Sequence, residues 1–384
     1  MTKSALFSLG FRPFFLLASL FSAIALALWA MVFADKWQLP VFSYYPMIIW
    51  HAHEMIFAYS MAVIAGFLLT AIKNWTGIQT VNGGKLALLA SIWLLARILP
   101  FVINNHWVIA IVDMLFLPLL AVFIALPLIK VGNKRNYFMI VLISVFAGLN
   151  LLLHLELLGF VQNMAQIAYK SAFYLIIALI IIMAGRVFPM FSQNGVPQRY
   201  QVTKYPIIEK LALPSYFIFA LSILFVPIKA IVIITALFAF VVHSIRLKGW
   251  YNRQIWQVPL VWVLHSGYAF LLLGFIFSII SQYNMLYTNL ALHAFSIGTL
   301  GIITIGMMAR VSVGHTGRNL RFPPKVLKIS FPLMLLAAFV RIILPTALPN
   351  AYHILVIIAA SLWSLAFLLF FISYVKMWIQ PRVD

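Results

Sequence analysis

The sequence predicts an all-α, polytopic membrane protein, and three observations support this fold class. Hydrophobic residues make up 65% of the 384-residue chain and charged residues only 8%, whereas soluble domains carry about 25% charged residues. About twelve apolar stretches are each long enough to cross a bilayer as a helix. Basic residues gather in alternate loops between them. We therefore expect a single transmembrane domain over residues 1–384, without a separate soluble domain.

The loops that join the predicted spans alternate in charge. With the N-terminus inside, 21 of the 26 Lys and Arg residues fall on the inner side and 5 on the outer side, as the positive-inside rule requires. We therefore expect both termini to be cytoplasmic. The predicted spans are residues 11–34, 51–72, 85–103, 107–129, 138–160, 166–190, 210–226, 229–246, 258–281, 288–311, 329–347 and 352–375.

The net charge of +20 is not a sign of nucleic-acid binding, because the basic residues sit in short loops between apolar spans. We expect no nucleic-acid partner. The chain has no cysteine, which excludes disulfides, iron–sulfur clusters and thiolate metal sites. A metal ion would therefore be held by histidine, methionine, carboxylate or backbone oxygen.

Two histidines and a glutamate stand at the start of the second predicted span, in the run WHAHEM at residues 50–55. Ionisable groups at this depth are costly, so they need a partner, a metal ion or a wet cavity. Side chains two positions apart on a helix point about 200° apart, so His51 and His53 serve different centres unless the entry turn is irregular. The alternative interpretation is an interfacial cap in which His51, His53 and Glu54 meet water.

Two further histidines share the predicted depth of that pair. His154 lies near the outer end of the fifth span, followed by Glu156, and His293 lies in the first turn of the tenth span. Three glycines after His293 leave room for another helix, which is the more frequent case, or for a flat porphyrin. The alternative for His154 is a histidine satisfied by hydrogen bonds within the bundle.

A second polar group is predicted on the inner side of the membrane. It consists of His265, His315, Arg310 and Arg318. The histidines are candidates for a second cofactor, and the arginines are candidates for pairing with haem propionates, because arginine pairs well with carboxylates. The alternative is that the arginines set the topology and that His315 lies in a solvated loop.

Several runs along the chain resemble the NnrS family of bacterial inner-membrane proteins. These runs are GFRPFF at 10–15, WHAHEM at 50–55, AGFLLTA at 65–71 with NWTG at 74–77, GRVFP at 185–189, HAFSIG at 293–298 and MMARVSVGHTGR at 307–318. The resemblance implies a multi-pass protein of the inner membrane that contains haem and copper. Because no cysteine is present for covalent attachment, we expect the haem to be haem b. The resemblance also implies a role in nitric oxide metabolism and in resistance to nitrosative stress, but it does not give a reaction.

The number of spans also invites comparison with haem–copper oxidases and nitric oxide reductases. Their core subunit has twelve helices in three four-helix units, with haem ligands on helices 2 and 10, and here spans 2 and 10 carry His51, His53 and His293. Spans 2, 6 and 10, each four helices apart, are followed by NWTG at 74–77, SQNG at 192–195 and HTGR at 315–318, which favours a weak internal repeat of three four-helix units. Spans 6 and 7 contain no histidine, so a second metal centre must be assembled differently from those enzymes.

These observations give a specific set of expected ligands. One of His51 and His53 is expected to pair with His293 across a haem, and the other is expected to join His154 at a second haem or a copper ion. Glu54 and Glu156 are the candidate catalytic residues. One role open to them is to accept the second ring N–H of a metal-bound histidine, and the other is to deliver protons from the outer side to a reducing centre.

Three functions remain open from the sequence. The first is a haem protein that binds or reduces nitric oxide, which requires an electron donor if nitric oxide is turned over. The chain also fits a twelve-helix transporter or a copper or haem conduit with the histidines as relay. The third possibility is a regulatory protein without turnover. Membrane lipid is the expected surrounding in each case.

Overall fold

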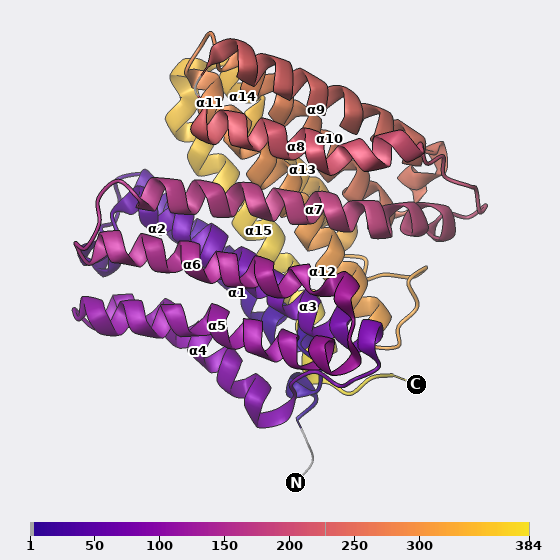
Figure 1. The fold of residues 1–384 in the computed structure, drawn as a ribbon, viewed down its shortest axis with the longest axis horizontal. Helices are drawn as coiled ribbons and strands as arrows, with labels where there is room; N and C mark the ends of the chain where they lie inside the picture. The colour runs from indigo at the N-terminus through magenta and orange to yellow at the C-terminus, as the bar shows by residue number, and fades with distance from the viewer. Residues whose placement is uncertain (1–3, 227, 384) are drawn as a thin grey trace. The chain divides into compact units, whose positions relative to one another are not determined.

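The fold is known from a computed structural model that describes residues 4–226 and 228–383 (Figure 1). Twelve helical segments within these residues are long and apolar enough to cross a membrane, which confirms the predicted class and places the spans within a few residues of their expected bounds. The helices are α1 (Phe11–Phe33), α2 (Met47–His53) with η3 (Glu54–Ser60) and α3 (Met61–Thr76), α4 (Gly83–Val102), α5 (His106–Val131), α6 (Phe138–Leu157), α7 (Ala165–Gly195), α8 (Pro206–Phe225), α9 (Lys229–Trp250), α10 (Pro259–Ile280), α11 (Leu286–His293) with η6 (Ala294–Gly301) and α12 (Ile302–His315), α13 (Leu327–Ile342), α14 (Leu344–Ala347) and α15 (Tyr352–Ile379).

The helices form two compact units. Unit 1 comprises Met1–Phe173, Val311–Arg318 and Phe371–Asp384, and unit 2 comprises Tyr174–Arg310 and Asn319–Phe370. In unit 1, α1 packs on α3, and α5 packs on α3, α4 and α6. In unit 2, α9 packs between α8 and α10, and α10 also packs on η6.

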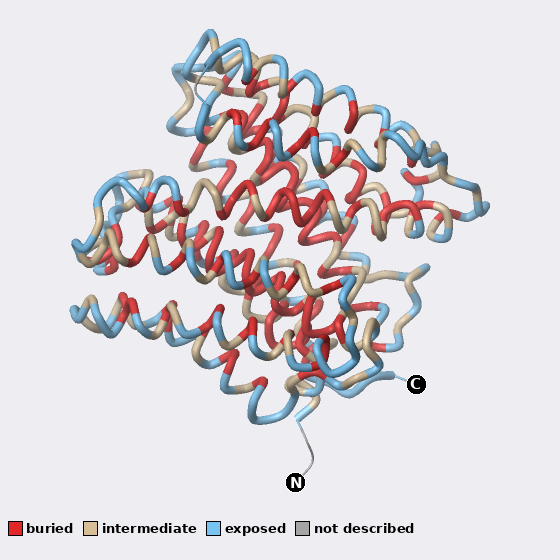
Figure 2. The backbone as a smooth tube through the Cα atoms, viewed as in Figure 1, coloured by how far each residue is buried: buried red, intermediate tan, exposed pale blue. Residues whose placement is uncertain are grey.

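Most helices bury only one face. Along α5 and α6 the buried and exposed residues alternate (Figure 2), and the exposed residues are largely apolar, such as Leu126 and Val141. Apolar side chains on an outward face suit contact with lipid tails. The apolar periodicity therefore explains both the bundle core and the membrane-facing surface.

Two of the spans differ from the rest because each contains a π-helix. In the span 47–76, His53 is the last residue of α2 and is followed by the π-helix η3; in the span 286–315, His293 is the last residue of α11 and is followed by the π-helix η6. These are also the most buried spans of the described chain. π-Helices are rare and occur often at functional sites. Spans 2 and 10 are thus alike in their backbone as well as in their sequence. Span 6, the third member of the weak repeat, differs from them, because α7 is α-helical throughout.

Candidate metal centre

Three buried side chains in unit 1 converge on one point, and we call them the His–Asp–His cluster. His53 at the end of α2, Asp113 on α5 and His154 on α6 each offer one ligand atom, and these atoms lie within 4.8 Å of one another. Oδ2 of Asp113 is 3.2 Å from Nε2 of His53 and 2.9 Å from Nε2 of His154. Both histidines are 0% exposed. The site is therefore assembled from three different helices.

The hydrogen bonds around His53 are unusual because both ring nitrogens face acceptors. Nδ1 is 3.0 Å from Oε1 of Glu54, while Nε2 faces Oδ2 of Asp113 and Oδ1 of Asn150, each at 3.2 Å. The amide of Asn150 donates to Asp113 at 2.7 Å, which fixes its orientation. A neutral imidazole has one donor nitrogen only. The contact at Nε2 therefore requires either a proton between His53 and Asp113 or a cation beside Nε2.

Negative side chains outnumber positive ones around the cluster. Arg97 on α4 donates to both carboxylate oxygens of Glu54, at 3.1 and 3.0 Å, and to Oδ1 of Asp113. All three side chains are buried. Two carboxylates against one guanidinium leave one negative charge uncompensated, which is costly in an apolar interior. A proton on His53 or a bound metal ion would balance it.

Two tyrosines before α2 complete the site. The hydroxyl of Tyr44 lies 2.7 Å from Nδ1 of His154, and burial raises the pKa of Tyr44 above its ordinary value, so the phenol stays protonated. The ring of Tyr45 lies 4.9 Å from that of His53. The hydroxyl of Tyr45 is buried and has no hydrogen-bond partner in the described part of the chain. A small polar molecule beside the cluster could accept a hydrogen bond from it.

The site fits a single metal ion with nitrogen and oxygen ligands. Two imidazoles and a carboxylate suit copper(II), iron(II) or zinc. Glu54 can accept a hydrogen bond from Nδ1 of His53, as carboxylates do from many metal-bound histidines. For His154 to bind through Nε2, its ring proton would lie on Nδ1, and this N–H could donate a hydrogen bond to the Tyr44 hydroxyl oxygen. A porphyrin fits less well between His53 and His154, because Asp113 Oδ2 contacts both Nε2 atoms and occupies the space that the ring would need.

The structure separates the two histidines of the second span. His51 stacks on Trp29 of α1, with ring centres 4.1 Å apart, while His53 enters the cluster. This divergence agrees with the angle expected for residues two apart on a helix. His53 is thus the helix 2 histidine that joins His154. The expected pairing of the other imidazole with His293 stays a prediction, because His51 and His293 belong to different units.

The predicted glutamates have different surroundings. Glu54 pairs with Arg97 and His53 inside the cluster. Glu156 accepts hydrogen bonds from the backbone N–H groups of Met164 and Ala165 at the start of α7, the second at 2.6 Å. Such contacts satisfy the free amides of a helix N-terminus. The catalytic roles of both glutamates stay predictions.

The remaining predicted residues lie apart from the cluster. In unit 2, Nδ1 of His293 is 2.7 Å from the carbonyl of Asn289, and Nε2 of His265 is 3.3 Å from the hydroxyl of Ser192. Arg310 lies over the ring of Phe191, 3.7 Å from its centre. The other two members of the predicted inner group, His315 and Arg318, belong to unit 1.

Sequence reasoning missed two central members of the site. The distribution of basic residues counts Arg97 only as a charge of the outer side of the membrane, and no motif in the sequence points to Asp113. Yet Asp113 is one of only six acidic residues and lies within an apolar span. Because an acid in that position is costly without a partner, this signal alone could have placed Asp113 in the site.

These features define a class: multi-pass helical membrane proteins with a buried histidine–carboxylate cluster capable of holding a metal ion. The family model described as NnrS protein matches residues 5–382, nearly the whole chain, so the chain belongs to the NnrS family. None of the curated proteins compared with the chain matches it.

Proposed function

We propose that this protein holds a redox-active metal ion at the His–Asp–His cluster and binds nitric oxide there. The observation that carries the proposal is His53, whose two ring nitrogens both face acceptors in a cluster with one excess negative charge. A cation at Nε2 would separate this nitrogen from the acceptor that it faces, and it would also balance the excess negative charge. Copper is the ion that the family resemblance favours, and the nitrogen and oxygen ligands suit it.

The surrounding residues support a small, uncharged ligand. When bound, copper or iron would supply an open coordination position and one-electron chemistry. The Tyr45 hydroxyl is positioned to donate a hydrogen bond to such a ligand, since its ring packs on His53 and it has no other partner in the described chain. Arg97 would keep Asp113 and Glu54 ionised and in place. Nitric oxide, which is small and neutral, can reach a buried site through apolar surroundings.

We also propose haem b as a second cofactor, bound by histidines outside the cluster. Its support is the family resemblance together with the layout of two spans, in which a histidine precedes a π-helix at His53 and at His293. Because His53 belongs to the cluster, His51 is the helix 2 imidazole that remains for this haem. An inner-membrane location with both termini cytoplasmic belongs to the same proposal, and it rests on the distribution of basic residues.

Metal analysis of the purified protein tests the proposal. We expect about one equivalent of copper or iron beyond the iron of haem, lost in His53→Ala and in Asp113→Asn, because three ligands define the site. The matched control is His106→Ala, which alters a half-buried histidine near Tyr44 that is not a member of the cluster. Equal metal content in the variants would refute the site.

A nitric oxide titration then separates the possible functions. For a nitric oxide-binding protein, we expect nitric oxide to change the visible or electron paramagnetic resonance spectrum of the metal in the parent but not in Asp113→Asn. A nitric oxide electrode with an electron donor distinguishes turnover from binding alone. Normal metal content with no response to nitric oxide would instead favour the transporter or conduit interpretation.

A further inference from the structure

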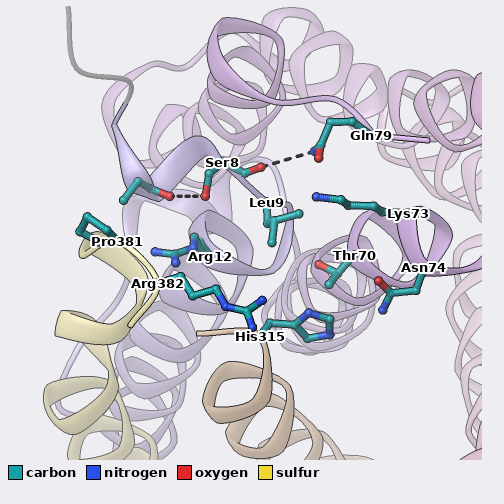
Figure 3. Close-up of a pocket in the computed structure, with 11 residues that line it drawn as sticks. Ser8, Leu9, Arg12, Thr70, Lys73, Asn74, Gln79, His315, Pro381 and Arg382 are labelled. Atoms are coloured by element: carbon teal, nitrogen blue, oxygen red, sulfur yellow. Dashed lines mark hydrogen bonds between the residues drawn. The ribbon is translucent and has the colours of Figure 1, made fainter. Parts of the chain in front are cut away.

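Unit 1 contains a second polar site, a cavity of about 610 Å³ that we call the cation pocket. It lies where α1 begins and where α3 and α12 end, beside the residues that follow α15. Arg12, Lys73, His315 and Arg382 contribute its basic side chains, and they come from all four of these segments (Figure 3). No aspartate or glutamate is found among the described residues that line it.

The positive charges of the pocket are largely unpaired. The side chains of Lys73 and Arg382 have no ion-pair or hydrogen-bond partner among the described residues, and Nε of Arg12 is buried without one. Arg12 is only 2% exposed, and its Nη1 donates to the carbonyl of Trp378 at 3.0 Å. In contrast, the buried guanidiniums of Arg97 and Arg246 each have a carboxylate partner.

The walls of the pocket are held by specific contacts. The N–H of Phe11 donates to the hydroxyl of Thr70 at 3.1 Å, which ties the start of α1 to α3. The indole N–H of Trp378 donates to Ser312 at 2.8 Å, which ties α15 to α12. The N–H of Val383 donates to the carbonyl of Thr316 at 3.0 Å. These contacts hold the basic side chains close together although they repel one another.

The orientation of the protein in the membrane does not by itself explain why these basic side chains are gathered and partly buried. Basic residues that set the orientation of a membrane protein need only lie in the loop, where water and salt screen them. Here a buried guanidinium keeps one donor without a partner, which costs free energy unless a ligand supplies the acceptor. Arg318 adds a further like charge beside Arg12, and its own Nη1 is buried and unpaired within the described residues.

We propose that the cation pocket binds a phosphate-bearing anion. Three permanently charged side chains line the pocket, so an anion with at least two negative charges neutralises them better than a single carboxylate does. Arginine and lysine together are common phosphate ligands. The volume exceeds that of inorganic phosphate, and it admits either an anionic lipid headgroup or a soluble phosphorylated molecule.

Two binding assays on the full chain distinguish these sources. In the first, the protein in phosphatidylcholine nanodiscs is titrated with pyrophosphate at constant ionic strength, with chloride as the reference anion. In the second, detergent-solubilised protein is mixed with cardiolipin or phosphatidylcholine and examined by native mass spectrometry. The test variant is Lys73→Gln combined with Arg382→Gln, which leaves Arg12 and its contact to α15 intact. The matched control is Lys130→Gln, an exposed lysine at the end of α5.

We expect one probe to bind, and the double variant to weaken that binding by about tenfold or more, because it removes two of the charged hydrogen-bond donors that line the pocket. Lys130→Gln should bind like the parent. Retained cardiolipin identifies a lipid site, and a response to pyrophosphate identifies a soluble ligand. Binding of neither probe above its reference, or equal binding by the double variant, would overturn the proposal.

Discussion

The imidazole rings of His53 and His154 lie 5.5 Å apart, centre to centre, with 75° between their planes. Each ring directs Nε2 at the same oxygen of Asp113. The two ring nitrogens and the carboxylate between them form a set of three possible metal ligands. The relationship joins residues from three helices, α2, α5 and α6.

Replacing Tyr45 with phenylalanine should have opposite effects on stability and on ligand binding. The hydroxyl has no partner in the described chain, so its removal should stabilise the ligand-free protein by about 1 kcal/mol. The same change should weaken nitric oxide binding at the metal. Thermal unfolding and a nitric oxide titration measure the two effects. Tyr44→Phe is the control, because it loses the bond to His154 and should be destabilised instead.

Replacing Arg97 with methionine should strongly destabilise the fold. The change leaves the carboxylates of Glu54 and Asp113 buried without their cation, at a cost of about 3–5 kcal/mol. Adding Glu54→Gln should recover part of the loss, because it removes one of the two charges. Thermal unfolding in detergent measures the effect, with Lys130→Gln as the neutral reference. A single variant as stable as the parent would show that the network is solvated.

A second ion pair gives a test that does not involve the metal centre. In unit 2, Arg246 on α9 pairs with Glu209 at 2.7 Å, and a Cβ added at Gly185 on α7 would overlap its Nη2. Gly185→Ala should therefore destabilise the protein by about 1–3 kcal/mol. Gly148→Ala is the matched control, since open space surrounds that helical glycine, and alanine there should stabilise by about 0.5–1 kcal/mol. The reverse order of stabilities would contradict the packing.

Haem content tests the proposal that His293 is a haem ligand. We expect His293→Ala to abolish one haem signal in a pyridine haemochrome assay. His353→Ala, at the start of α15, should leave haem content unchanged. Full haem content and an unaltered spectrum in His293→Ala would transfer the assignment to His265 and His315, with Arg310 and Arg318 as the propionate partners.

Reporter fusions test the proposed topology. Fusions at Gly132 and Gly195 should report the cytoplasmic side, and fusions near Asn163 and Tyr287 the opposite side, because the basic residues concentrate in alternate loops. The four positions follow different spans, so an error of one helix would reverse some of them. Any such reversal contradicts the topology.

The spans were predictable and the pairing of side chains was not, for a physical reason. Membrane spans are recognised from consecutive residues, so the length of an apolar stretch and the charges that flank it locate each helix. Composition and depth also identified His53, Glu54 and His154 as candidates. The partners Arg97 and Asp113 depend on how α4 and α5 are rotated about their axes, which hydropathy leaves undetermined. The choice between His51 and His53 likewise depends on the backbone at the start of η3.

The π-helices that follow His53 and His293 also bear on the history of the chain. A π-helix differs from the α-helix around it by one added residue in the turn, so it behaves as the trace of a single-residue insertion. Both insertions stand directly after a histidine, in spans that end in the same Thr-Gly pair. Parsimony favours one insertion in an ancestral segment that was later duplicated over two independent events at matching positions.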